Sequence, residues 1–118
     1  MAEFIIYKEI DKNAFLKRYK GCAEVAALIA IFQAQITNAT TLSLTRKNVR
    51  DLSPLKDLRN LQTFCVGYTQ VSDLSPLKDL QNLRNLSISS TQIRDLSPLK
   101  DLQNLQILSI YQNQVSSR

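Results

Sequence analysis

The chain has 118 residues, which is enough for one domain, and its hydrophobic content of 44% excludes a disordered chain. The net charge of +5 is spread along the sequence without a run of five like charges, so nucleic-acid binding is not expected. Histidine is absent, which excludes Ser-His-Asp and Cys-His catalysis and leaves the two isolated cysteines without partners for zinc. We therefore expect no enzyme, no catalytic or metal-binding residues and no cofactor.

The first residues, Met1-Ala2-Glu3-Phe4, lack the basic region and apolar run of a signal peptide. Cys22 and Cys65 are expected to be reduced thiols, so a cytoplasmic location is predicted. The apolar stretch Val25–Phe32 is too short to cross a bilayer. No membrane partner is expected.

Residues 1–38 are predicted to form an N-terminal helical cap, which begins with a short strand over Glu3–Lys8. Asp11 is expected to cap a helix to about Lys20, and Gly21 to end it. A second helix is predicted over Cys22–Gln35. It is apolar most of the way round, with a main stripe and two residues beside it, so burial on more than one side is expected. The stripe comprises Val25, Ala26, Ile29, Phe32 and Gln33, with Leu28 and Ile31 beside it. Alternatively, part of the cap forms an oligomer or partner surface.

From residue 39 onward the sequence is periodic. The block Leu-Ser-Pro-Leu-Lys-Asp-Leu begins at Leu52, Leu74 and Leu96, at intervals of 22 residues. A fixed period of about 20–29 residues with leucines at set offsets predicts a stacked solenoid. Apolar residues alternate with the period of a strand in four pairs, and Ser-Pro followed by leucines spaced by three predicts a 3₁₀ turn. The pairs are Leu42/Leu44, Phe64/Val66, Leu86/Ile88 and Leu108/Ile110.

This pattern resembles the leucine-rich repeat family in its 22-residue, internalin-like subclass, which also includes a regulatory subunit of a protein phosphatase. The resemblance covers roughly Leu42–Val115 and rests on L-x-L-x-x-N-x-I followed by D-L-x-P-L. It implies an α/β solenoid, with parallel strands on the concave face, 3₁₀ returns on the convex face, and the helical cap. About three and a half repeats are expected over residues 39–118, continuous with the cap. One column departs from the motif, because only its last member is the asparagine of the family; Lys47 is expected to bend into solvent. The column reads Lys47, Thr69, Thr91 and Asn113.

The concave positions vary between repeats, whereas the convex Lys-Asp pairs that begin at Lys56 are identical. Duplication of one unit explains the identity, and an array of functional Lys-Asp pairs is the alternative. The varied columns predict a protein-binding surface with Tyr68 and Tyr111 as anchors. Arg46, Lys47 and Arg50 make the first repeat basic, so an acidic partner is expected there. The predicted contact residues are Arg46, Thr63, Cys65, Tyr68, Asn85, Ser87, Ser89, Ile107, Ser109, Tyr111 and Gln112.

The last strand has no predicted neighbour on its outer side. Leu108, Ile110 and Val115 are therefore predicted to form an edge that pairs with a partner or with a second copy as a homodimer. The favoured function is a protein–protein interaction module, such as a small bacterial immunity protein that occludes a toxin. The alternatives are a regulatory or scaffold subunit of the phosphatase-regulator kind, and a self-assembling structural protein.

Overall fold

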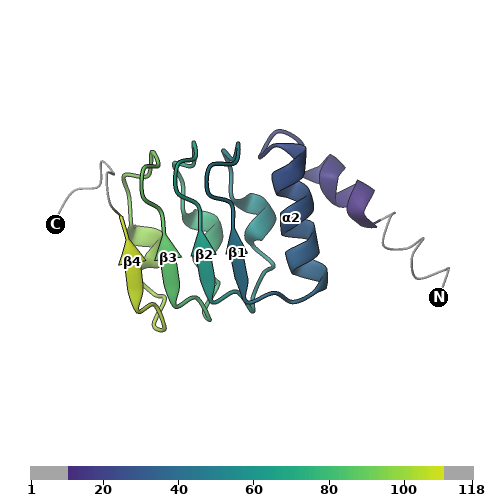
Figure 1. The fold of residues 1–118 in the computed structure, drawn as a ribbon. Helices are drawn as coiled ribbons and strands as arrows, with labels where there is room; N and C mark the ends of the chain where they lie inside the picture. Colours follow the sequence, from purple (N-terminus) through teal and green to yellow (C-terminus); the bar gives the residue numbers. More distant parts are fainter. Residues whose placement is uncertain (1–10, 111–118) are drawn as a thin grey trace.

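The computed structural model describes residues 11–110, which form two helices followed by a stack of strands and 3₁₀ turns (Figure 1). The strand predicted over Glu3–Lys8 lies outside the described residues, as do Tyr111, Gln112, Asn113 and Val115. The helices span residues 11–18 and Val25–Ile36 (α2). The strands are β1 (Thr41–Ser43), β2 (Thr63–Cys65), β3 (Asn85–Ser87) and β4 (Ile107–Ser109), and the 3₁₀ turns are η1 (Ser53–Leu55), η2 (Ser75–Leu77) and η3 (Ser97–Leu99).

The four strands form one parallel sheet in chain order, as the repeat predicted. Each residue pairs with the residue 22 positions later, so that Thr41 faces Thr63 and Thr63 faces Asn85. The hydrogen bonds continue past the short strands, because the N–H of Leu44 donates to Cys65 and that of Val66 to Ser87. This register places equivalent residues of successive repeats side by side, and it confirms the solenoid.

The return from each strand is held by apolar columns and a 3₁₀ turn. Proline occupies the first turn of each 3₁₀ segment, where its missing N–H costs no hydrogen bond. From the sequence, the serine before each proline is expected to cap the free N–H groups of the turn, and this expectation is wrong: the N–H and the hydroxyl of Ser53 both donate to Asp51 Oδ1, at 2.9 and 2.7 Å. Ser75 repeats this arrangement with Asp73. The aspartate accepts the free donors at the start of the turn because its short side chain reaches the N–H two residues on.

The core is a stack of aligned apolar side chains between the sheet and the turns. Phe64 and the leucines around it, from Leu44 to Leu86, are almost fully buried. Thr69 and Thr91 occupy the column that the family fills with asparagine, and each buried hydroxyl donates to a carbonyl of its own turn at 2.8 Å. Lys47 is half-buried, so the expectation that it bends fully into solvent is only partly met. Its own N–H closes the turn on Leu44 at 3.1 Å.

The two helices cover the β1 end of the stack (Figure 1). Rings of the first helix pack on α2, with Phe15 and Phe32 centroids 5.4 Å apart. The loop before α2 is tied to the first repeat by backbone bonds, including Glu24 N–H to Asn48 O at 2.7 Å and Arg50 N–H to Cys22 O at 2.8 Å. Gly21 has φ of 92°, which suits its predicted place at the end of the first helix.

The apolar stripe predicted for α2 is wrong in its orientation. Val25 is 61% exposed and Ile29 is 36% exposed, whereas Leu28 and Ile31, expected beside the stripe, are buried. A helix that is apolar all round does not reveal which side will dock. The β1 end of the stack selected the side with Leu28 and Ile31.

Candidate functional site

The varied side chains of the strands gather on one surface, which we call the sheet face. It consists of the side chains that alternate with the buried residues, together with those just after each strand. Its described members, all exposed or half-buried, are Thr41, Ser43, Arg46, Thr63, Cys65, Tyr68, Asn85, Ser87, Ser89, Ile107 and Ser109. All predicted contact residues within the described range lie on this surface, and the structure brings them into adjacent rows. Tyr111 and Gln112 fall outside that range.

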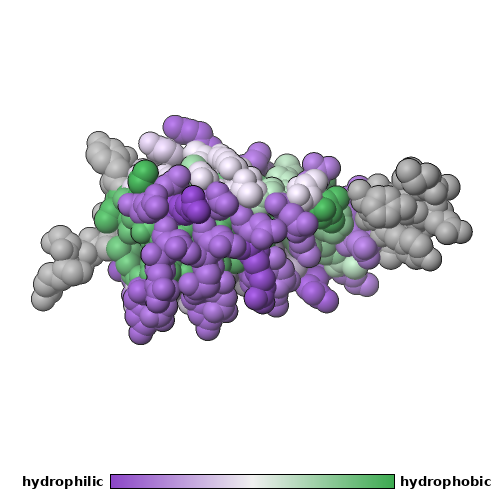
Figure 2. All heavy atoms as spheres, turned by 90° about the horizontal axis from the view of Figure 1, so that it is seen from below, coloured by the Kyte–Doolittle hydropathy of each residue, from purple (hydrophilic) through white to green (hydrophobic). Residues whose placement is uncertain are grey.

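The sheet face is neutral along the strands and rich in small hydroxyl and amide groups. Asn85 Nδ2 donates across the strands to Thr63 Oγ1 at 3.4 Å, and Ser43 Oγ lies 3.3 Å from Thr45 Oγ1. In Figure 2 pale atoms of weakly polar residues run along one side of the molecule, while strongly hydrophilic ridges project on the other. Small uncharged groups leave the strand surface open to close approach by another molecule.

In each of the first three repeats, one residue that follows the strand has a left-handed backbone conformation, which is unfavourable for its residue type. Arg46, Tyr68 and Ser90 have φ of 66°, 59° and 58°, at intervals of one repeat. The N–H groups of Arg46 and Tyr68 each donate at 3.0 Å to the next repeat, to Gly67 O and Ser89 O. The left-handed region costs most residues roughly 1–2 kcal/mol, and glycine or asparagine adopts it more readily. The stack therefore requires this turn, but it does not require arginine or tyrosine in it.

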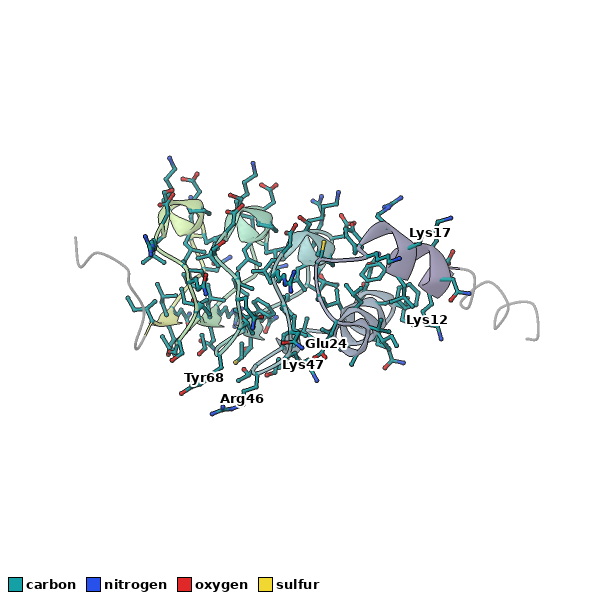
Figure 3. The ribbon with its side chains drawn as sticks, turned by 90° about the horizontal axis from the view of Figure 1, so that it is seen from above. Lys12, Lys17, Glu24, Arg46, Lys47 and Tyr68 are labelled. Carbon is teal, nitrogen blue, oxygen red and sulfur yellow. The ribbon has the colours of Figure 1, made fainter. Side chains whose placement is uncertain are left out.

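The two large side chains of this column contact each other. The Arg46 guanidinium carbon lies 4.2 Å from the centroid of the Tyr68 ring, and the Tyr68 side chain is 47% exposed. Figure 3 shows both projecting from the sheet face, while Lys47 lies with Glu24 nearer to α2. An exposed cation–π contact contributes about 0.5–1 kcal/mol. This does not offset two left-handed residues, so fold stability alone does not explain the pair.

The opposite surface carries identical charges in each repeat. Lys56 and Asp57 and their equivalents, Lys78, Asp79, Lys100 and Asp101, are all exposed, as predicted. Asparagines join neighbouring repeats there, since Asn82 Nδ2 donates to Arg59 O and Asn104 Nδ2 to Gln81 O, each at 2.8 Å. This role was not predicted from the sequence, although the asparagines recur with the repeat. These contacts between repeats explain why the asparagines recur, whereas duplication of one unit stays the prediction for the identity of the exposed Lys-Asp pairs.

The acidic residues before the 3₁₀ turns serve the backbone. Hydrogen bonds from the Ser75 hydroxyl and N–H lower the pKa of Asp73, and those from the Ser97 N–H and hydroxyl lower the pKa of Asp95. Among residues 11–110, no group of three His, Cys, Asp or Glu side chains is placed to hold a metal ion. The carboxylates of Asp51, Asp73 and Asp95 accept hydrogen bonds at the start of the 3₁₀ turns, so their role is structural.

The two cysteines are free and half-buried. Cys22 lies in the cap, where burial and the nearby Asp51 carboxylate raise the pKa of its thiol; the Sγ–Oδ2 distance is 3.8 Å. Cys65 lies on β2 in the sheet face.

In the part of the chain that the structure describes, no helix has the length and hydropathy needed to span a bilayer.

The predicted edge lies at β4, which pairs with β3 and with no other described strand. Ile107 is 58% exposed, Ile110 is 37% exposed and Leu108 is half-buried. Val115 lies outside the described residues. The structure therefore places Leu108 and Ile110 together at the last described strand.

Comparison with known proteins places this stack among repeat proteins. Residues 81–117 match the family described as Leucine Rich repeats (2 copies). A crystal structure of internalin C2 from Listeria monocytogenes is 36% identical over 71% of this chain, with a TM-score of 0.67. An internalin InlF structure from the same organism is 27% identical over 72% of this chain, with a TM-score of 0.54. The curated proteins contain no match.

The chain spans 38% of the internalin C2 chain and 32% of the InlF chain, so the similarity concerns only part of those proteins. The 22-residue period, the parallel register and the 3₁₀ returns agree with these matches. The chain belongs to the leucine-rich repeat proteins, in their 22-residue, internalin-like class.

Proposed function

We propose that the sheet face binds a protein partner through the residues defined above. Leucine-rich repeats are in general protein–protein interaction folds, and a short stack offers another macromolecule one continuous surface. The observation that carries the proposal is the Arg46–Tyr68 pair, two exposed side chains of the types that dominate interfaces, kept in an unfavourable backbone conformation. Contact with a partner would explain why an arginine and a tyrosine occupy these left-handed positions.

More specifically, we propose that the protein is a non-catalytic inhibitor that occludes one target, as an immunity protein covers a toxin. Occlusion needs a tight, shape-matched surface and no reactive group. Residues 1–38 and 39–118 act in this proposal as one continuous domain, since the cap shares backbone hydrogen bonds with the first repeat. The partner is expected to be acidic near that repeat, where Arg46, Lys47 and Arg50 lie. The cytoplasmic location expected from the sequence stays a prediction.

The test is affinity capture from the native cell with a matched pair of variants. Ser87→Arg adds a large cation in the middle of the sheet face, and Gln81→Arg adds the same group on the opposite, exposed surface. We expect Ser87→Arg to lose a stoichiometric partner and Gln81→Arg to keep it, with circular dichroism showing both folded. Loss of the partner by both variants, or by neither, would contradict the sheet-face assignment.

The identity of the captured protein separates the biological roles. A toxin-like partner supports the immunity proposal, whereas a housekeeping enzyme supports a regulatory or scaffold subunit. Tyr68→Ala in the same assay should weaken binding by about 1 kcal/mol or more if Tyr68 is a hot spot. Unchanged affinity would remove Tyr68 from the interface.

Self-association through β4 is a second candidate, supported by the exposed Ile107 and Ile110 beside a strand with one described neighbour. Sedimentation at micromolar concentration should then show a dimer. Ile107→Lys should convert it to a monomer, because a charge on each copy would oppose pairing. A monomeric wild-type chain would exclude this candidate.

A further inference from the structure

We infer that the Arg46–Tyr68 pair is the anchor point for a carboxylate, supplied by an acidic side chain of the protein partner; this inference rests on the proposed function. Arg46 is exposed, and its guanidinium contacts the Tyr68 ring. Among residues 11–110, no carboxylate pairs with this guanidinium and no acceptor bonds its N–H groups. The charge is thus held in place while its hydrogen-bond donors remain available.

The stacking determines how a ligand can approach. The guanidinium carbon lies over the Tyr68 ring at 4.2 Å from its centroid, so a ligand can reach the N–H donors only from the side that the ring does not cover. A carboxylate meets such an edge with two parallel hydrogen bonds in the same plane. Because the ring and the left-handed backbone already restrict Arg46, less side-chain freedom is lost on binding than for an unstacked arginine.

The surroundings favour a singly charged anion. The strand surface beside the pair is formed by uncharged residues such as Thr63, Cys65 and Ser87. Glu24 Oε1 accepts the N–H of Asn48, the residue after Lys47, at 3.2 Å, so a carboxylate already lies near this end of the sheet face. Phosphate recognition typically uses a cluster of arginines around one anion, and among residues 11–110 only the Arg46 guanidinium contacts the Tyr68 ring. An aspartate or glutamate side chain fits this site better than a phosphorylated residue.

The test is an NMR titration of the full chain with three capped peptides that alternate serine with glutamate, glutamine or phosphoserine. We expect the glutamate peptide to shift the Arg46 Nε–H and the Tyr68 ring signals, and the glutamine peptide to leave them in place. Arg46→Gln should weaken glutamate-peptide binding by about tenfold. Arg94→Gln removes the same charge from another exposed position and should have little effect.

Tyr68 variants separate the positioning role of the ring from general binding. Tyr68→Phe keeps the aromatic face and should bind the glutamate peptide like the wild-type chain. Tyr68→Leu should weaken binding about threefold, because the guanidinium loses its cation–π contact.

Three outcomes would overturn the carboxylate anchor. These are equal losses for Arg46→Gln and Arg94→Gln, glutamate-peptide shifts centred on Lys56 and Lys78, or phosphoserine binding at Arg46 that is tenfold tighter than glutamate binding. The protein partner provides the separate test. If Ser87→Arg loses the captured partner while Arg46→Gln keeps it at unchanged affinity, the sheet face remains the binding surface and only the carboxylate anchor fails.

Discussion

The two surfaces of the solenoid use the same repeat in opposite ways. On the side of the 3₁₀ turns, each unit repeats an aspartate that accepts from a serine, and asparagines bond the preceding repeat. On the strand side, the equivalent positions hold different residues, and three of them, Arg46, Tyr68 and Ser90, have an unfavourable backbone conformation. The turn side is constrained by stacking, whereas the strand side chains project away from the stack and can vary without disturbing it. This division is what makes a repeat stack suitable for recognition.

The largest effect is expected from breaking the stack itself. Leu77 in η2 is fully buried between neighbouring turns, so Leu77→Ala should lower the free energy of unfolding by about 2–5 kcal/mol. Urea unfolding measures this loss. The neighbouring Lys78 is exposed, and Lys78→Ala should change stability by less than about 0.5 kcal/mol. Similar losses of stability for the two variants would contradict the conclusion that Leu77 holds the stack together while Lys78 is only solvated.

A smaller loss is expected from the asparagine that joins two repeats. Asn82→Ala removes the hydrogen bond to Arg59 O and should cost about 1 kcal/mol. Gln81→Ala changes an adjacent exposed side chain and serves as the control in the same unfolding experiment. If Asn82→Ala is as stable as the control, the contact between repeats does not contribute.

The Asp73 carboxylate should make part of the stability depend on pH. Its pKa in the folded chain lies below 3.8, because the Ser75 hydroxyl and N–H donate to the charged form. The contribution is therefore fully present above pH 3.8 and is lost as the pH falls through the folded pKa. Asp73→Asn should reduce this acid dependence in urea unfolding at pH 7, 5 and 3. Asp79→Asn is the control, since the Asp79 side chain has no hydrogen bond within residues 11–110; an unchanged acid profile in Asp73→Asn would refute the role.

The smallest effect on stability is expected on the sheet face, where the effect on binding should be large. Arg46→Asn or Tyr68→Asn loses the cation–π contact but relieves the left-handed strain, so the free energy of unfolding should stay within about 0.5 kcal/mol of wild type. Thermal unfolding measures this, and capture of the partner should fail in parallel. A clear destabilisation with binding intact would show that the pair serves the fold instead.

The repeat residues made most of the fold and of the candidate surface predictable. Leucines at fixed intervals, with Ser-Pro before the turns, were sufficient to predict the parallel strands, their order and the 3₁₀ returns, because each unit can bury its apolar side only against its neighbours. The alternation around Phe64 and Val66 likewise predicted that Thr63 and Cys65 would face outward. The capping role of Asp51 was missed because serine and aspartate both have side chains suited to that position.

The sequence by itself determined the register, since a unit of constant length can stack only with equivalent residues side by side. Tertiary structure decided the features that depend on contacts between different segments. The docked side of α2 is one example, because Val25 and Leu28 are both apolar and only the shape of the β1 end distinguishes them. The Arg46–Tyr68 contact is the other: these residues lie one repeat apart in the sequence, and they meet because the parallel register and the left-handed turn direct both side chains to the same point on the sheet face.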